Sequence, residues 1–326
     1  MNTDDYFRHN DKFRTNMRYY ILTAFVILVL LTCFIPVSQR TEIIIAANFD
    51  NTVEQIIHPD NWKKWYPGIK ESWQSDSSGF RLTKDDIAKT FTITTARKKY
   101  VIKTITLLSY EVTENNSDRF YLTVFPLLSP DSTKVITKAN TRLLFKLFSF
   151  LHNYSAESTA GGLKSFLENP IALYGFPVEI KKVTDTVYLT TNFVANKNNL
   201  FEKLPMMFSD IDGFILKNKL NIINNKDIAY ATLNNDSLQV MVGIPVNKIV
   251  TGNDHIYCMQ MPKGRMLVGQ YEGRFDERQS IYRAMQKYIF DHHLSMIAQS
   301  YERYLNNRLP VADSSHIQIE LYIPIL

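Results

Sequence analysis

The sequence has little cysteine: only Cys33 and Cys258 occur in 326 residues. Their separation gives neither a zinc-ligand spacing nor a disulfide framework. His292 and His293 are adjacent, so on a helix they diverge and lack the i, i+4 spacing with which two histidines share a metal ion. The sequence also lacks the G-x-S-x-G, P-loop and H-E-x-x-H motifs. We therefore predict no metal site, no cofactor and no catalytic residue that a motif identifies.

The chain also lacks a stripe of basic residues. Its 37 Lys and Arg against 32 Asp and Glu give a net charge of +5, and this charge is spread along the chain. Nucleic-acid-binding proteins concentrate basic residues on one face or helix, so we predict no nucleic-acid partner. The composition, with 45% hydrophobic and 21% charged residues, is that of a globular protein. A length of 326 residues suits two modest domains.

One long stretch has no charge: residues 19–37 read YYILTAFVILVLLTCFIPV. A helix of this length, at about 1.5 Å per residue, nearly matches a hydrocarbon core of about 30 Å. Four basic residues precede it and one follows closely: Arg8, Lys12, Arg14 and Arg18, then Arg40. This bias predicts a single-pass membrane protein with residues 1–18 in the cytoplasm and the C-terminal domains outside, on the periplasmic or extracellular side. The alternative, a cleaved signal peptide, is disfavoured because the stretch is long and no Ala-x-Ala site follows.

Residues 41–170 read as one strand, short helices, several strands and a long helix. TEIIIAANFD (41–50) is typical of a strand, and short helical segments carrying Trp62 and Trp65 follow. Alternating segments rich in β-branched and aromatic residues then predict an antiparallel meander. Apolar residues at helical spacing predict a helix over about 144–167, which Gly161 and Gly162 should break or bend.

This first half resembles a known family. IIIAANFDNTVEQIIHPDNWKKWYP (43–67) is similar to the opening of START-like (SRPBCC, polyketide-cyclase-type) domains, and GGLKSFLE (161–168) resembles the start of their closing helix. The resemblance implies a helix-grip fold, an antiparallel sheet around a long C-terminal helix, with a cavity for lipids or other apolar ligands. Trp65 is then a candidate ligand-binding residue. Whether the cavity is hollow or filled by the domain's own side chains stays open.

The second half contains an internal repeat. PMMFSDIDGFILKNKLNII (205–223) aligns with QSIYRAMQKYIFDHHLSMI (279–297) at a constant offset of 74. Apolar residues three and four apart predict an amphipathic helix in each copy. Each helix is preceded by a strand and followed by a strand that ends in Ile-Pro. Two such units should pair into one sheet with both helices on one face.

The repeat also carries a second resemblance. MPKGRMLVGQYEGRFDE (261–277), SYERYLNN (300–307) and IELYIPI (319–325) resemble the GyrI-like effector-binding domain, the small-molecule sensor of some transcription activators. The resemblance covers about residues 175–326 and implies a two-repeat αβ sandwich, whose groove binds cationic, planar, hydrophobic ligands through aromatic residues and one carboxylate. The family's glutamate corresponds to Glu302. Four tyrosines are the further candidate ligand-binding residues: Tyr301, Tyr304, Tyr230 and Tyr271.

Elementary electrostatics gives Glu302 the same role. A buried carboxylate is costly unless it is paired, and a ligand cation can complete the pair. Aromatic faces add cation–π attraction of about 0.5–2 kcal/mol each. The alternative is that Glu302 pairs with Arg303 or another exposed basic residue. An exposed ion pair of this kind contributes little to the stability of the fold.

Together these features predict an α+β protein with an N-terminal transmembrane helix (19–37), a START-like domain (41–170) and a GyrI-like domain (175–326). The predicted function is the binding or sensing of hydrophobic, cationic or amphipathic small molecules at a membrane, in a bacterial protein. The first alternative is a hydrolase with Glu302 as general base, although the sequence favours binding over catalysis. The second is a non-catalytic scaffold for a partner protein, marked by a large exposed apolar patch.

Overall fold

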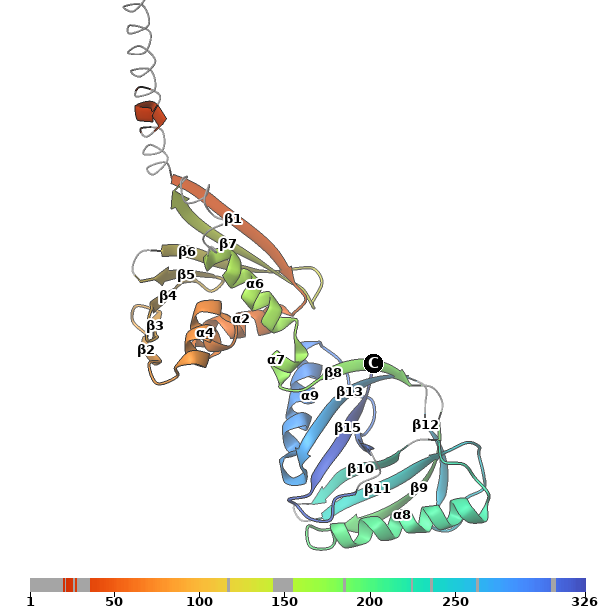
Figure 1. Ribbon diagram of the computed structural model, residues 1–326. Helices are drawn as coiled ribbons and strands as arrows, with labels where there is room; N and C mark the ends of the chain where they lie inside the picture. Colours follow the sequence, from red (N-terminus) through yellow and green to blue (C-terminus); the bar gives the residue numbers. More distant parts are fainter. Residues whose placement is uncertain are drawn as a thin grey trace, which may run out of the picture. The chain divides into compact units, whose positions relative to one another are not determined.

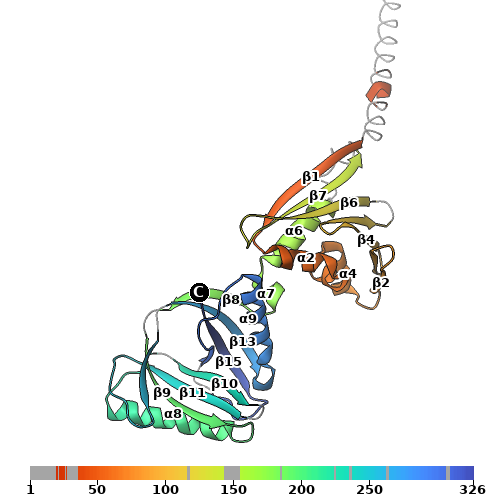
Figure 2. The ribbon, with the colours of Figure 1, turned by 180° about the vertical axis from the view of Figure 1, so that it is seen from behind.

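The computed structural model divides the chain into two compact units, Met1–Glu168 and Asn169–Leu326. It describes residues 20, 22–25, 27, 36–115, 118–142, 155–183, 186–223, 225–234, 237–261, 264–305 and 309–326. Each unit contains one antiparallel sheet and a few helices (Figures 1 and 2). The predicted α+β class is therefore confirmed.

The first unit is built on a seven-stranded antiparallel sheet in the order β1-β7-β6-β5-β4-β3-β2. Its strands are β1 (Pro36–Ile45), β2 (Arg81–Asp85), β3 (Thr90–Thr94), β4 (Lys99–Thr106), β5 (Ser109–Glu114), β6 (Asp118–Pro126) and β7 (Thr133–Arg142). Apolar residues alternate along these strands, as in β5, where Tyr110 and Val112 are buried. One face is therefore apolar, and helices cover it.

The helices of this unit are α2 (Phe49–Ile57), η1 (Pro59–Asn61), α3 (Trp62–Trp65), α4 (Pro67–Ser75) and α6 (Ser155–Leu167). Helix α6 contacts β1, β7 and α3. It runs without interruption through Gly161 and Gly162, so the expected break is absent. The first part of the predicted helix, residues 144–154, lies outside the described residues.

The predicted transmembrane helix requires correction. Among the described residues, no helix combines the length and the apolar character needed to cross a membrane. Pro36 and Val37, the last residues of the predicted span, belong to β1 and pair with β7. A backbone held in a β-ladder is not part of a helix, so the uncharged run is not one helix over 19–37. The predicted fold class, which included this transmembrane helix, is therefore wrong, and so is the predicted single-pass membrane localisation. Residues 1–18 and most of residues 19–37 lie outside the described residues.

The second unit is built on an eight-stranded antiparallel sheet in the order β12-β9-β11-β10-β14-β15-β13-β8. Its strands are β8 (Val178–Val183), β9 (Thr186–Ala195), β10 (Lys226–Asn234), β11 (Ser237–Val246), β12 (Tyr257–Met261), β13 (Gly264–Arg274), β14 (Tyr301–Tyr304) and β15 (His316–Ile325). Its helices are α7 (Pro170–Tyr174), α8 (Leu200–Lys217), η3 (Phe275–Glu277) and α9 (Gln279–Asp291). Helices α8 and α9 pack their apolar residues into a single core with one face of the sheet.

The repeat appears in the structure as approximate two-fold symmetry. The two copies meet where β10 pairs with β14, and Ile228 lies directly opposite Glu302. These two residues are 74 apart, the offset that relates helices α8 and α9 in the sequence. Phe201 and Phe275 have the same offset, and their rings contact each other at 5.3 Å between centroids. Residues of equivalent position in the two copies therefore meet at the centre of this unit.

Candidate functional site

Glu302 lies at the centre of the second unit, on the short strand β14 between β10 and β15. Because side chains alternate along a strand, Glu302 and Tyr304 face the helices, whereas Tyr301 and Arg303 face the opposite side. The Glu302 side chain is fully buried. The alternative in which Glu302 forms a surface pair with Arg303 therefore does not describe this structure.

Three side chains donate hydrogen bonds to the Glu302 carboxylate. Its Oε1 atom accepts from Arg278 Nε at 2.9 Å and from the Tyr282 hydroxyl at 2.8 Å. Its Oε2 atom accepts from the Tyr304 hydroxyl at 2.6 Å. A guanidinium and two hydroxyl donors thus satisfy both oxygen atoms of this buried side chain.

Arg278 enters this cluster from the start of α9. Its guanidinium carbon lies 3.6 Å from the ring centroid of Phe275 and 5.4 Å from that of Tyr230. Burial acts to lower the pKa of Arg278, but the Glu302 carboxylate and the nearby tyrosines outweigh it, so the net pKa is raised. The cluster therefore holds a charged guanidinium between a carboxylate and aromatic faces, the arrangement that recognises an organic cation.

Burial raises the pKa of three tyrosines in the cluster, and the Glu302 carboxylate raises it further: Tyr230, Tyr282 and Tyr304. The Tyr230 and Tyr304 hydroxyls are neighbours, and their residues stand at equivalent positions of the two copies. With a raised pKa each hydroxyl stays protonated, and those of Tyr282 and Tyr304 donate to Glu302. The site therefore combines fixed donors, one anion and one cation in an apolar environment.

The first copy of the repeat shows what these positions contain when they only fill a core. Three apolar residues stand 74 positions before Arg278, Tyr282 and Glu302: Leu204, Phe208 and Ile228. All three are buried. These charged and hydroxyl-bearing side chains are thus specific to the second copy.

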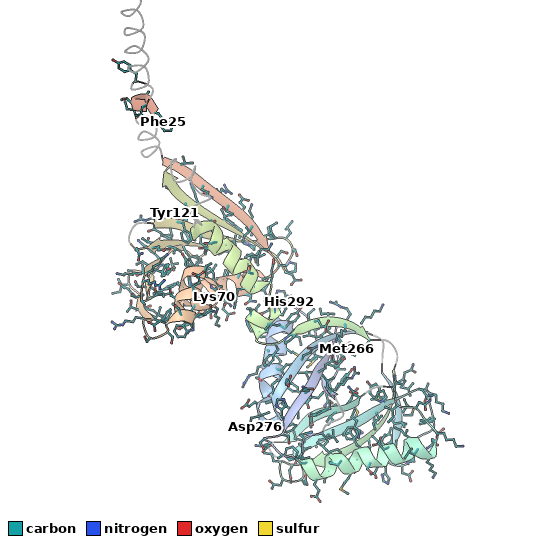
Figure 3. All side chains as sticks on the ribbon, in the orientation of Figure 1. Phe25, Lys70, Tyr121, Met266, Asp276 and His292 are labelled. Carbon is teal, nitrogen blue, oxygen red and sulfur yellow. The ribbon has the colours of Figure 1, made fainter. Side chains whose placement is uncertain are left out.

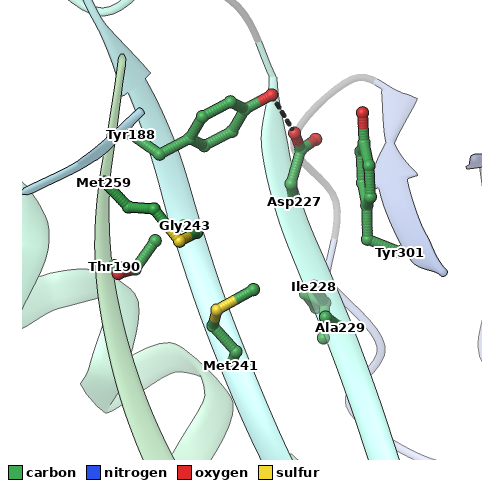
Figure 4. Close-up of a pocket in the computed structure, with 9 residues that line it drawn as sticks. All are labelled: Tyr188, Thr190, Asp227, Ile228, Ala229, Met241, Gly243, Met259 and Tyr301. Atoms are coloured by element: carbon green, nitrogen blue, oxygen red, sulfur yellow. Dashed lines mark hydrogen bonds between the residues drawn. The ribbon is translucent and has the colours of Figure 1, made fainter. Parts of the chain in front are cut away.

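The opposite face of β14 carries a second polar group. Arg303 Nε donates to Asp227 Oδ1 at 3.2 Å, and the Tyr188 hydroxyl donates to Asp227 Oδ2 at 2.6 Å. The Tyr301 and Tyr322 rings stack beside it, with centroids 5.0 Å apart. A cleft of about 20 Å³ lies at this place, room for about one water molecule. Figure 4 draws the residues that line it, among them Tyr188, Asp227 and Tyr301. Tyr301 belongs to this face, so it does not line the Glu302 site with Tyr304.

The hydroxyl of Tyr271 and the indole of Trp65, the two remaining candidates, are bonded to backbone carbonyl oxygens. Tyr271 is buried on β13, and its hydroxyl donates to the carbonyl oxygen of Arg274 at 2.6 Å. Trp65 belongs to the first unit, where it is buried and its indole N–H donates to the carbonyl oxygen of Gln55 at 3.1 Å. The structure thus brings Glu302, Tyr304 and Tyr230 together. Tyr301 lies on the opposite face of the sheet and Trp65 in the first unit, whereas Tyr271 lies in the same core as Tyr304, two strands away.

Sequence reasoning missed Arg278 and Tyr282 as members of the site. A usable signal was present, because the offset of 74 aligns Tyr282 with Phe208 and Arg278 with Leu204. A charged residue aligned with a buried leucine in an internal repeat indicates a position with a special role. Within the described ranges, no group of three or more His, Cys, Asp or Glu side chains is placed to hold a metal ion.

Comparison with known families assigns the second unit. Residues 187–326 match the model of the GyrI-like small molecule binding domain. Residues 187–326 form a GyrI-like small-molecule-binding domain. No curated protein matches the chain.

The GyrI-like domain is also similar to solved structures. EcmrR in a DNA complex is 15% identical over 46% of this chain and 57% of that chain, with a TM-score of 0.40. This chain thus spans 57% of that EcmrR chain. The C-terminal domain of EcmrR is 13% identical over 46% of this chain and 98% of that chain, also at 0.40. A hydrolase from Listeria innocua is 10% identical over 46% of this chain and 91% of that chain, with a TM-score of 0.37. SAV2435 bound to tetraphenylphosphonium is 10% identical over 46% of this chain and 94% of that chain, with a TM-score of 0.29.

Figure 3 draws side chains on the ribbon and labels Met266, which belongs to β13 of the GyrI-like domain. Met266 packs with Tyr301 and Tyr322 on the face of the sheet opposite the main core. The two faces of the GyrI-like domain therefore have different chemistry. The Glu302 site lies on the helix-covered face, and a smaller apolar cluster beside the Asp227–Arg303 pair lies on the other.

Proposed function

We propose that this protein binds hydrophobic small molecules that carry a positive charge, through the GyrI-like domain, with Glu302 as the counter-ion. The observation that carries the proposal is a fully buried carboxylate, surrounded by tyrosine hydroxyls and aromatic faces, at the meeting point of the two repeats. The apolar residues at the equivalent positions of the first copy support it, since they indicate that the fold does not need this anion.

For the first unit we propose a START-like domain that binds an apolar ligand containing a polar group. An antiparallel sheet with a C-terminal helix packed on it supports this assignment. Two buried oxygen atoms, Gln55 Oε1 and the Tyr100 hydroxyl, have no hydrogen-bond partner among the described residues. Buried polar atoms of this kind call for a water molecule or a ligand group.

The first experiment is a titration of the full chain with tetraphenylphosphonium, a hydrophobic cation, and with triphenylphosphine oxide, its neutral counterpart. We expect the cation to bind, and Glu302→Gln to weaken its binding by about tenfold or more, because the ligand charge then lies unpaired in an apolar site. The matched control is Glu272→Gln, which removes an exposed carboxylate from β13 of the same domain. Calorimetry gives the affinities.

Tryptophan fluorescence locates the binding site. All three tryptophans, Trp62, Trp65 and Trp73, lie in the first unit. A ligand at Glu302 should leave their emission unchanged, whereas a ligand in a START-like cavity should alter it. Equal affinities of the wild type and Glu302→Gln for tetraphenylphosphonium would contradict the proposed role of Glu302.

A further inference from the structure

The cation position of the Glu302 site is already occupied by the chain's own Arg278. Its Nε atom bonds to the carboxylate at 2.9 Å, and its guanidinium lies against the rings of Phe275 and Tyr230. A carboxylate and aromatic faces are the groups that a bound organic cation would contact here. Arg278 therefore makes within the protein the contacts that a cationic ligand would make.

The fold does not need Arg278 at this place. The equivalent residue of the first copy, Leu204, is buried and apolar. Replacing a buried ion pair by apolar residues of similar volume is often neutral or stabilising. The Arg278–Glu302 pair therefore indicates a role other than stability.

Arg278 is also the member of the cluster that is able to leave. Its side chain is 13% exposed, whereas that of Glu302 is 0% exposed. It stands at the N-terminus of α9, where the helix dipole disfavours a positive charge. Its Nη1 atom donates to the nearby carbonyl oxygen of Phe275, and among the residues that the structure describes Glu302 is its hydrogen-bond partner on the sheet. Turning toward solvent thus breaks the ion pair with Glu302 and the contacts of the guanidinium with the Phe275 and Tyr230 rings.

We infer that Arg278 is a competitor built into the ligand site, and that it sets the specificity of the site for hydrophobic cations. Such a cation replaces the guanidinium at Glu302, Phe275 and Tyr230 while Arg278 turns to solvent. A neutral ligand offers Glu302 no substitute charge and leaves the pair in place. The inference rests on the proposed function, because it concerns the same site. If Arg278 occupies the site for about nine-tenths of the time, the apparent affinity for a cation is about tenfold below the intrinsic one.

The test compares tetraphenylphosphonium affinity by calorimetry in the full-length wild type, Arg278→Gln and Arg274→Gln. Arg278→Gln removes the competing charge, so we expect its affinity to rise by about tenfold or more. Arg274→Gln is the matched control, because Arg274 is an exposed arginine of the same segment that pairs with Asp276. Its affinity should equal that of the wild type.

A second measurement identifies the vacated position directly. Methylguanidinium added to Arg278→Gln should weaken tetraphenylphosphonium binding, because it refills the place of the lost side chain; the wild type should respond far less. Arg278→Lys keeps the charge but loses the planar contact with Phe275, so its affinity should lie between those of the wild type and Arg278→Gln. This variant decides the question if Arg278→Gln does not fold.

An unchanged or weaker affinity in Arg278→Gln, or in Arg278→Lys if only that variant folds, would overturn the inference. The Glu302→Gln variant separates this outcome from failure of the proposed function. If Glu302→Gln loses tetraphenylphosphonium binding while Arg278→Gln shows no gain in affinity, the competitor role of Arg278 is wrong. The proposed binding site at Glu302 is then still supported. If Glu302→Gln binds as the wild type does, both proposals are wrong.

Discussion

Replacing Glu302 by isoleucine, the residue of the first repeat, should lower the free energy of unfolding of the GyrI-like domain by about 3–5 kcal/mol. The change leaves the Arg278 guanidinium without its counter-ion and the Tyr282 and Tyr304 hydroxyls without their acceptor. An uncompensated buried charge accounts for most of this loss. Because Arg278 is partly exposed and is able to reach solvent, we expect a value near the lower end.

The matched variant changes all three positions at once to the residues of the first copy: Arg278→Leu, Tyr282→Phe and Glu302→Ile. It should recover the stability of the wild type or exceed it, since apolar residues of similar volume replace the buried pair without leaving a charge or hydroxyl unpaired. The stability change of the triple variant should therefore differ from the sum of the changes of the single variants, as is expected of residues that act as one cluster.

Denaturant unfolding is followed by near-ultraviolet circular dichroism together with tryptophan fluorescence. All three tryptophans lie in the first unit, so a transition that appears in the dichroism and not in the fluorescence belongs to the GyrI-like domain. The interpretation would be wrong if Glu302→Ile were as stable as the wild type. It would also be wrong if the triple variant were no more stable than the single one.

The fold of the second unit was predictable because its signals are local and repeated. Apolar residues three and four apart in two segments, 74 residues from each other, predicted both helices and their common face of the sheet. Strand alternation also contained information that the sequence interpretation did not use. Tyr301 and Glu302 are neighbours in one strand, so their side chains had to lie on opposite faces.

The partners of Glu302 were less accessible to sequence reasoning, because they depend on tertiary packing. Arg278 and Glu302 are separated by 24 residues, and they meet only because α9 packs on β14 and its neighbours. The uncharged run over 19–37 was misassigned for a related reason. Hydropathy described its composition, whereas the pairing of Pro36 and Val37 with β7 is a long-range contact that composition does not contain.

The last prediction concerns the two adjacent glycines of α6, for which substitution by alanine should have opposite effects. A Cβ atom on Gly162 would lie 2.5 Å from the carbonyl oxygen of Trp65 and 3.0 Å from Pro67 Cδ. The first contact is with backbone, which cannot move aside without displacing the segment between α3 and α4. We expect Gly162→Ala to destabilise the first unit by about 1–3 kcal/mol, because overpacking outweighs the better helix propensity of alanine.

A Cβ atom on Gly161 would meet no atom within 4 Å, and this residue is exposed. Gly161→Ala should therefore stabilise the same unit by about 0.5–1 kcal/mol, since alanine loses less backbone entropy in a helix. Urea unfolding followed by tryptophan fluorescence measures both variants, because all three tryptophans lie in this unit and Trp65 forms the contact at Gly162. A gain in stability from both substitutions would show that α6 does not approach Trp65 closely. A loss from Gly162 alone would establish that glycine is needed there for close packing of the helix.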